Sequence, residues 1–388
     1  MKFNITTNPQ HYTDKYFSRT KQILEAEGLN PFVRAQVFIR RGPGYLAGID
    51  ESLELLEQSP LVENGGRVYS LQEDTTYHPK ETLMLIEAQV QDIIELETLY
   101  LGILSAETTK VNDHQGIDLF NVRDNMQKVV SLANGRPVSY FGARHWHYKS
   151  DESISRAAFK GGASSASTDV GAATSGQEGI GTIPHALENI YAFYKGQENA
   201  VVESTLAFDR VMDESIPRVA LIDYANREIT DSIETAQALN GKLSAVRVDT
   251  CGENIAQGAL ELPSEEFSYP KEHEKYWIGT GVTVTGVYAL RQGLDAAGFE
   301  DVKIMLTSGF GNPEKVEAFV EAENYLGVKL FDGLGVGGIF ESRMATMDIV
   351  AVGPSLESLV SMSKTGREYS PNQKLKLRLG GRKWKFKL

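Results

Sequence analysis

Six short apolar segments recur in the second part of the chain, and each precedes a polar or glycine-rich turn and a helical stretch. They cover residues 138–141, 219–222, 245–248, 302–306, 328–331 and 349–352. The steps from residue 219 to 245 and from 302 to 328 are both 26 residues, about the length of a strand, a helix and two short loops. This alternation predicts a parallel sheet, and the number of units favours a closed barrel over an open sheet. We therefore expect an irregular, TIM-like α/β barrel over residues 137–345.

The residues on either side of this region have different patterns. Residues 1–136 mix strand and helix patterns, which predicts an α/β sandwich domain, with strands at 32–39, 67–72 and 82–90 and helices at 92–104 and 118–132. The third segment, 346–388, ends in alternating apolar and basic side chains from Lys374 to Leu388, a pattern typical of strands. Because its apolar side chains need burial, we expect this segment to return to the sheet of the first domain. A basic tail that binds an anionic surface is the less favoured alternative.

The composition excludes several classes of protein. The 388 residues suggest two or three domains, and 41% hydrophobic with 23% charged residues is typical of a globular protein. A net charge of −13 argues against nucleic-acid binding, although a local basic cluster can still hold a small anion. No apolar run approaches the roughly 18 residues of a membrane helix, and the first residues contain no apolar signal core. A single cysteine, Cys251, excludes an internal disulfide and a cysteine zinc site. We expect a cytoplasmic enzyme or binding protein.

Polar residues and glycines follow the predicted barrel strands, where active sites of such barrels form. Asp223 and Asp249 each come directly after a strand, and glycine-rich turns occupy residues 307–311 and 332–338. Glycines let backbone N–H groups approach a phosphate, so we expect one to be held by Ser308, Gly309, Gly335 and Gly337. The alternative is that these glycines only make tight turns. Two such turns in successive units favour phosphate binding.

Cationic and aromatic residues gather just after the first barrel strand. Arg144 is followed by His145 and His147, and Arg156 and Lys160 come shortly afterwards. Arginine and lysine suit carboxylate or phosphate, so anion recognition ranks above metal binding by the two histidines. For Arg156 alone, a surface ion pair is an open alternative.

His185 opens a predicted helix after the sequence Gly-Thr-Ile-Pro. It could be a nucleophile, a proton carrier or a packed side chain, and composition alone favours packing. Cys251 is better interpreted as a small buried side chain than as a nucleophile.

Several motifs together resemble the nicotinate phosphoribosyltransferase family, especially its shorter archaeal-type members. They are residues 13–17 (Thr-Asp-Lys-Tyr-Phe), 142–144, 161–162 with the following Ser/Thr run, 181–185, 247–249, 308–309 and 335–338. The resemblance implies an α/β sandwich plus an irregular barrel. It also implies the reaction of nicotinate with 5-phosphoribosyl 1-diphosphate to nicotinate mononucleotide and pyrophosphate, with Mg²⁺. ATP hydrolysis is commonly coupled in this family through a phosphorylated histidine, which corresponds to His185.

The resemblance and the chemistry of the reaction together imply a role for each candidate residue. Arg144 and Lys160 would offset the negative charge of pyrophosphate or of the nicotinate carboxylate. Asp223 and Asp249 would hold ribose hydroxyls, Asp249 would also stabilise the cationic sugar, and it is the candidate for Mg²⁺ held through the substrate. Tyr16 would stack on the pyridine ring from a neighbouring subunit, which implies at least a dimer. The further substrate-binding candidates are Arg156, Ser167 and Thr182.

Two departures and two rival functions complete the sequence picture. One cysteine cannot build the zinc element of some archaeal members, and His145 stands where many relatives have a second arginine, which puts the carboxylate clamp in doubt. Quinolinate phosphoribosyltransferase shares the architecture, but its diacid substrate calls for a denser basic cluster. A phosphosugar isomerase or aldolase would instead need a Schiff-base lysine or a glutamate base at a strand end.

Overall fold

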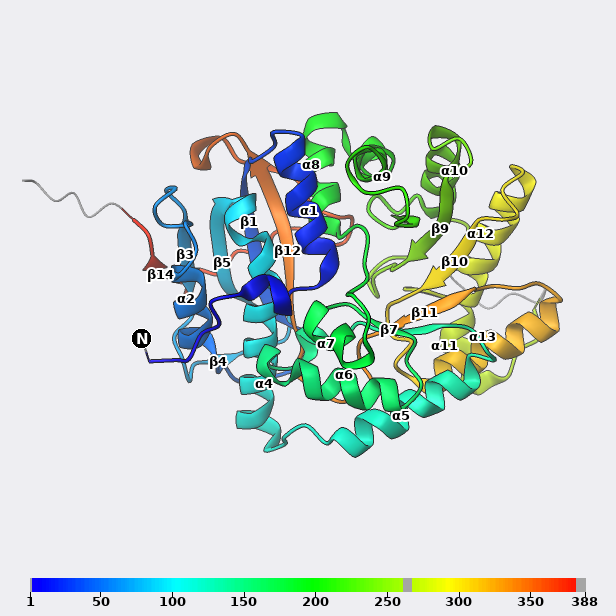
Figure 1. Ribbon diagram of the computed structural model, residues 1–388, viewed down its shortest axis with the longest axis horizontal. Coiled ribbons are helices and arrows are strands. Elements are labelled where there is room, and N and C mark those ends of the chain that lie inside the picture. The colour runs from blue at the N-terminus through cyan, green and yellow to red at the C-terminus, as the bar shows by residue number, and fades with distance from the viewer. Residues whose placement is uncertain (1, 261–266, 382–388) are drawn as a thin grey trace, which may run out of the picture.

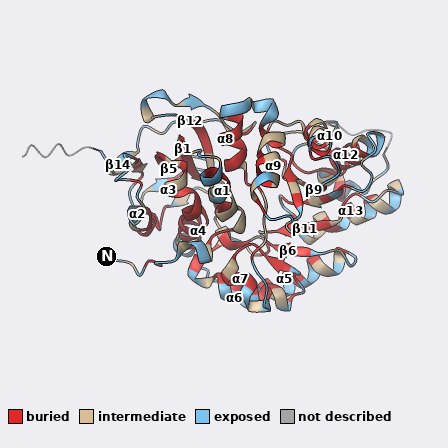
Figure 2. Cartoon of the chain, turned by 45° about the horizontal axis from the view of Figure 1, so that its top comes forward, coloured by how far each residue is buried: buried red, intermediate tan, exposed pale blue. Residues whose placement is uncertain are grey.

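The computed structural model describes residues 2–260 and 267–381, which form two six-stranded sheets lying beside each other (Figure 1). Each sheet has its own core of buried apolar side chains. In Figure 2 the strands of both sheets are mainly buried, whereas the outer faces of the surrounding helices are exposed. Among the described residues, no helix is long and apolar enough to cross a membrane.

The first sheet is parallel and is built by the strand–helix units that the sequence predicts. Its order is β7 (Ser165–Ala166), β6 (Val138–Tyr140), β11 (Gly333–Val336), β10 (Lys303–Leu306), β9 (Leu243–Val248) and β8 (Arg218–Leu221). The edge strands β7 and β8 do not pair with each other in the described part of the chain. Instead, Ile180 donates to Ala166 (2.9 Å) and the Thr182 hydroxyl to the Val219 carbonyl (2.8 Å). The sheet is therefore curled and parallel, and a regular closed barrel is not confirmed.

One strand of this sheet lies later in the chain than its apolar pattern predicts. The apolar residues 328–331 lead up to the sheet, and the strand itself is the glycine-containing β11. A Cβ at Gly333 would lie 2.5 Å from the Met305 methyl, and one at Gly335 would lie 2.6 Å from the Phe141 ring. Only residues without a side chain fit between these neighbours, so the apolar pattern alone misplaces the strand.

The second sheet is antiparallel and combines strands from both ends of the chain. Its order is β13 (Val360–Ser361), β12 (Ala345–Gly353), β1 (Phe32–Ile39), β5 (Thr82–Gln89), β3 (Arg67–Ser70) and β14 (Lys376–Leu379). Residues 349–352, which share the apolar pattern of the barrel segments, lie outside the parallel sheet and belong to β12, which pairs antiparallel with β1. The chain after residue 344 thus returns to the N-terminal sheet, where β14 pairs with β3. Trp384 and Phe386 lie outside the described residues, and the domain boundaries at residues 136 and 345 stay a prediction.

The helices cover the outer faces of the sheets and pack between them (Figure 1). The longer ones are α1 (Lys15–Ala26), α2 (Ile49–Glu57), α4 (Glu97–Asp113), α5 (Leu119–Leu132), α6 (Asp151–Lys160), α8 (His185–Lys195), α9 (Ala200–Val211), α10 (Glu228–Ala238), α12 (Val284–Ala296) and α13 (Pro313–Leu326). Asn312 and Pro313 are typical of a helix start, and α13 begins there: the Asn312 side chain accepts from the Glu314 N–H (3.1 Å) and Pro313 stands in the first turn. Both α4 and α8 contact β12 of the antiparallel sheet.

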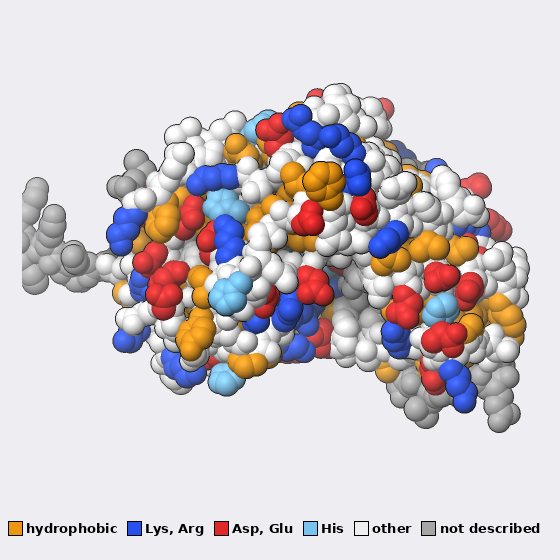
Figure 3. All heavy atoms as spheres, turned by 90° about the horizontal axis from the view of Figure 1, so that it is seen from below, with side chains coloured by type: hydrophobic (Ala, Val, Ile, Leu, Met, Phe, Trp, Pro, Cys, Tyr) orange, Lys and Arg blue, Asp and Glu red, His pale blue; other side chains and the backbone are white. Residues whose placement is uncertain are grey.

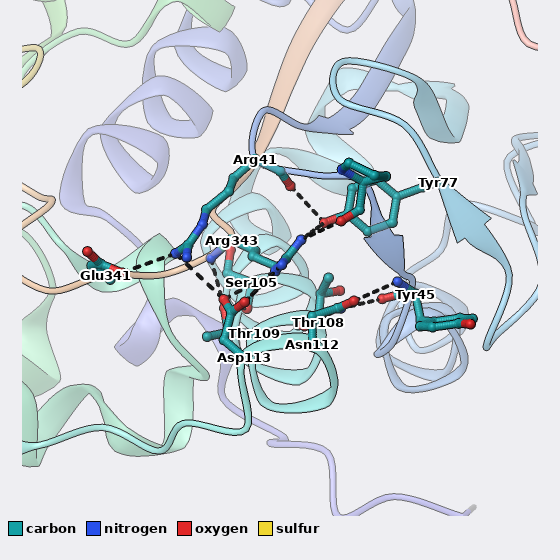
Figure 4. Close-up of polar contacts among 11 residues, drawn as sticks. Arg41, Tyr45, Tyr77, Ser105, Thr108, Thr109, Asn112, Asp113, Glu341 and Arg343 are labelled. Carbon is teal, nitrogen blue, oxygen red and sulfur yellow. Dashed lines mark hydrogen bonds and ion pairs between the residues drawn. The ribbon is translucent and has the colours of Figure 1, made fainter.

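A buried arginine fastens the connection between β11 and β12 to α4 (Figure 4). The Arg343 guanidinium donates to both carboxylate oxygens of Asp113, at 2.8–3.1 Å, and to the Pro43 carbonyl at 3.0 Å. The Arg343 N–H donates to the Thr109 hydroxyl at 2.8 Å. This charge-assisted pairing holds the chain in place where it leaves one sheet and enters the other.

Candidate functional site

A polar cavity lies where the carboxyl ends of β8 and β9 face β12 of the other sheet. Its polar lining includes Tyr16, Arg144, His185, Arg247, Asp249 and Lys364. The fold thus brings together four residues that the sequence nominates, Tyr16, Arg144, His185 and Asp249, from four distant segments. Tyr16 lines the cavity of its own chain, and a contribution from a neighbouring subunit stays a prediction.

Three side chains form a buried charged group behind this cavity. His185, the first residue of α8, places its Nε2 at 2.9 Å from Asp223 Oδ1, and the Lys364 ammonium donates to the other Asp223 oxygen. Burial opposes the ionisation of Asp223, but the charge of Lys364 and the hydrogen bond with His185 hold the pKa of this carboxyl well below its usual range. Burial, with the charge of Lys364, lowers the pKa of His185. The imidazole is therefore neutral at pH 7.

The hydrogen bond to Asp223 also selects the tautomer of His185. A carboxylate can only accept a hydrogen bond, so the neutral ring carries its proton on Nε2. Nδ1 then holds the free lone pair, and among the described residues it has no hydrogen-bond partner. A neutral imidazole with one available nitrogen can act as a nucleophile, which the sequence left open beside packing.

Arg144 is held by carboxylates from the N-terminal part of the chain. Its Nη1 donates to Glu97 Oε1 at 3.0 Å, and its Nε lies 3.6 Å from Asp14 Oδ2. Burial, only partly offset by Arg144, raises the pKa of Glu97 to about 8. A protonated Glu97 leaves part of the Arg144 charge uncompensated, so this guanidinium is available to an anion in the cavity.

Asp249 is the carboxylate that lines the cavity at the end of β9. Its Oδ1 accepts from the Thr307 hydroxyl at 2.9 Å, and its Oδ2 lies 3.6 Å from Arg247 Nη1. No group of three or more acidic, histidine or cysteine side chains that could hold a metal ion occurs among the described residues. Asp249 can therefore offer one ligand to a cation that a substrate brings with it.

An apolar cavity of about 330 Å³ adjoins the polar one and shares Tyr16 and Arg247 with it. Its walls come from the parallel sheet and from the segment that spans β7 and β8, and they include Phe141, Thr182 and Gly335. Two of the nominated residues, Thr182 and Gly335, therefore lie at this second cavity. The polar cavity and the apolar cavity therefore meet at Arg247.

The two glycine turns lie against each other at the ends of β10 and β11. A Cβ on Gly311 would lie 2.3 Å from the Gly338 carbonyl oxygen, and one on Gly337 would lie 2.9 Å from His145 Nε2. Ser308 and Gly309 both have positive φ, at 67° and 89°. The two turns therefore touch each other, and close packing accounts for Gly337. Phosphate binding by these turns stays a prediction.

Arg156, Lys160 and Ser167 are among the nominated residues that line neither cavity. Arg156 and Lys160 line a separate surface groove on α6 together with the exposed Phe120, and Arg156 pairs with Glu152 at 2.6 Å. The surface ion pair that was the alternative for Arg156 is therefore the one observed. Seen from below, this side of the molecule carries basic and acidic side chains in a mixture (Figure 3). Ser167 is buried after β7, and its hydroxyl has no hydrogen-bond partner among the described residues.

Replacing both groove residues should leave catalysis unchanged. In the variant Arg156→Gln/Lys160→Gln we expect kcat and the KM of a phosphoribosyl donor within about twofold of the parent, because neither side chain lines either cavity. Steady-state kinetics would check this. A tenfold rise in the KM of the donor would return these residues to the donor site.

Sequence reasoning missed Lys364 and Glu97, which carry much of the electrostatics of the site. Lys364 lies in a polar stretch after β13, and nothing in its neighbours marks it as buried. Glu97 begins α4, where an acidic residue is ordinary. Of the cations that line the polar cavity, Arg247 could have been found from the sequence. It stands two residues before Asp249 and so points to the same side of the extended chain.

Comparisons with known proteins agree with this arrangement. Residues 14–107 match the model of the quinolinate phosphoribosyl transferase N-terminal domain. Nicotinate phosphoribosyltransferase pncB1 of Mycobacterium tuberculosis is 24% identical over 267 residues, which cover 61% of this chain and 56% of that protein. Nicotinate phosphoribosyltransferase pncB2 of the same organism is 26% identical over 310 residues, covering 79% and 55%. The chain is similar in sequence to these two nicotinate phosphoribosyltransferases. It spans just over half the length of these two curated relatives.

A solved structure shares the fold of this chain. The crystal structure of nicotinate phosphoribosyltransferase from Vibrio cholerae superposes with a TM-score of 0.61 and 12% identity, covering 92% of this chain and 88% of that one. At this identity the likeness shows a common fold. The resemblance first seen in the motifs is thereby confirmed, from the sequence relatives and the fold together.

Proposed function

We propose that this protein is a nicotinate phosphoribosyltransferase, which forms nicotinate mononucleotide and pyrophosphate from nicotinate and 5-phosphoribosyl 1-diphosphate. The observation that carries the proposal is the pair of joined cavities. The polar cavity, with Arg144, Asp249 and Lys364, suits a sugar with charged phosphates, and the apolar cavity suits a pyridine ring. The bond formed in the reaction joins these two kinds of group, and the cavities meet at Arg247.

The residues can assist each charge that the reaction creates. The pyridine nitrogen attacks ribose C1, the C1–oxygen bond breaks, and its electron pair leaves with pyrophosphate. Positive charge grows on the sugar, where the Asp249 carboxylate is the nearby anion, and negative charge grows on the leaving group, which Arg144 stabilises. Holding both reactants in adjoining cavities adds the advantage of orientation.

Mg²⁺ fits this site only as a cation that the donor carries. Asp249 has oxygen ligands of the kind that Mg²⁺ prefers, whereas Asp223 is already engaged by His185 and Lys364. Bound to the diphosphate, the cation would neutralise charge on the leaving group. Asp249 would then hold it in place.

We further propose that ATP phosphorylates His185 and that this phosphohistidine couples ATP hydrolysis to transfer. The geometry that supports this is the neutral ring with its free Nδ1, oriented through Nε2 by Asp223. Pyridine attack at C1 needs no histidine, so phosphorylation would act by favouring a conformation that binds the substrates better.

Replacing His185 by alanine should remove the response to ATP and keep a slow transfer. We expect the ATPase activity to disappear and the ATP stimulation, about tenfold, to be lost, while ATP-independent transfer continues. Transfer with and without ATP, measured beside thermal unfolding, checks this. If a stably folded His185→Ala protein is still stimulated by ATP, His185 has no part in the coupling.

The proposed function is tested by offering three acceptors with one donor. Purified protein, 5-phosphoribosyl 1-diphosphate and Mg²⁺ are incubated with nicotinate, nicotinamide or quinolinate, with and without ATP. We expect the mononucleotide from nicotinate at a rate at least tenfold above that from the other two. Product from quinolinate alone, with release of carbon dioxide, would favour the quinolinate enzyme, whose N-terminal domain matches this chain. Light scattering on the same sample tests the predicted dimer.

A further inference from the structure

One cation at the apolar cavity has no role in the site described so far. Arg19 lies on α1, three residues after Tyr16, and both side chains line the apolar cavity. The Arg19 guanidinium donates to the Gly181 carbonyl oxygen through one N–H of Nη1. Within residues 2–260 and 267–381, no carboxylate lies within ion-pair distance of it. Four of its five N–H groups are therefore available to a ligand.

The surroundings of Arg19 are otherwise poor in charge. The cavity wall is largely apolar, with Phe141, Met305 and Leu334 from the parallel sheet. The nearest acids are Asp169, which is paired with Lys15 at 2.9 Å, and Glu178. A guanidinium beside an apolar cavity and without a partner of its own favours a bound anion.

The other cation of this cavity is already engaged. Arg247 lies 3.6 Å from Asp249 and donates to the Ile183 carbonyl at 3.1 Å. It also stands where the two cavities meet. A ring whose nitrogen points toward Arg247 and the polar cavity would direct its substituent into the apolar cavity, which Arg19 lines.

We propose that Arg19 binds the carboxylate of the aromatic acid acceptor and selects an acid over the corresponding amide. The inference rests on the proposed function, and it assigns to the Arg19 guanidinium the discrimination between acid and amide acceptors. An acid gains a charge-assisted pair with the guanidinium fork, whereas a neutral amide offers only one weak acceptor oxygen. Arg19 is thus a specificity residue for the acceptor and takes no part in bond breaking.

Arg19→Gln should weaken the binding of nicotinate and leave the use of nicotinamide unchanged. We expect the KM of nicotinate to rise by about tenfold to hundredfold, with kcat at saturation within about threefold of the parent. The kcat/KM of nicotinamide should stay within about twofold. Arg19→Lys keeps the charge but not the forked guanidinium, so its KM for nicotinate should fall between that of the parent and that of Arg19→Gln. Arg210→Gln, an arginine on α9 paired with Glu27 and outside both cavities, is the matched control and should behave like the parent.

Direct binding separates this inference from the proposed function. Calorimetric titration with nicotinate and with benzoate should give an affinity at least tenfold weaker in Arg19→Gln than in the parent. If the parent binds benzoate through Arg19 yet transfers to none of the acceptors, the proposed function fails and the carboxylate site stands. If the parent binds no aromatic acid, or if Arg19→Gln binds acids as tightly as the parent, the inference is overturned. Thermal unfolding of both variants confirms that the fold is intact.

Discussion

Replacing Lys364 with methionine is expected to lower the free energy of unfolding by about 3–5 kcal/mol, because it leaves the buried carboxylate of Asp223 without its cation. Methionine keeps the length and the apolar stem of lysine, so lost charge and not lost volume causes the change. The same variant should lose the ATP stimulation of transfer, since His185 is oriented by the same carboxylate. Urea unfolding monitored by fluorescence measures the stability.

The pH dependence of this variant has a definite sign. In the parent, the pKa of Asp223 is held below its usual range, so the pair stabilises the fold above the ordinary carboxyl pKa of about 3.9 and this stabilisation is lost as the pH falls further. Without Lys364 the carboxyl is easier to protonate, and the gap in stability between parent and variant should narrow on acidification. Lys374→Met, which removes an exposed partner of Glu81, should cost less than about 1 kcal/mol. Equal losses of stability in Lys364→Met and Lys374→Met would contradict a stabilising role of the buried Lys364–Asp223 pair.

The largest effect on catalysis is expected from Asp249→Asn. Asparagine preserves the hydrogen bond from Thr307 and the shape of the cavity but removes the negative charge beside the developing cationic sugar. We expect kcat/KM for nicotinate to fall by about 10²- to 10³-fold, comparable to the loss of one electrostatic contact to a transition state. Single-turnover measurements would show whether the chemical step itself is slowed.

The control for this substitution is Asp124→Asn, which alters an exposed carboxylate paired with Arg123 on α5. It makes the same chemical change at a residue that lines neither cavity, so kcat/KM should stay within about twofold of the parent value. An Asp249→Asn protein that retains more than a tenth of the parent activity would remove Asp249 from transition-state stabilisation.

Local pattern was sufficient for most of the elements. The apolar alternation of residues 32–39 and the 26-residue steps predicted β1 and the parallel strands β8, β9 and β10. The cap at Asn312 predicted the start of α13. These signals are local, since alternation, periodicity and capping depend on residues that lie close in the sequence.

Partners distant in the sequence decide the place of two strands, and one of them, β11, was predicted too early in the chain. The β11 strand needs glycines at 333 and 335 only because Met305 and Phe141 approach them from other segments. Residues 349–352 have the same apolar pattern as a barrel strand, but β1 offers them a long antiparallel partner. An apolar segment of this length is compatible with either sheet, and pairing energy makes the choice.

The sequence by itself determined which polar residues are candidates at the ends of the strands: Asp223, Asp249, Arg144 and His185 stand beside strands or helix starts that could be predicted. Only the tertiary structure decided which of the cations meet them. It excludes Arg156 and Lys160 from both cavities and places Lys364 and Arg19 at them, although no local feature distinguishes these four side chains. The physical reason is that a charge acquires its role from burial and from the opposite charges around it. Both depend on how segments far apart in the sequence pack together.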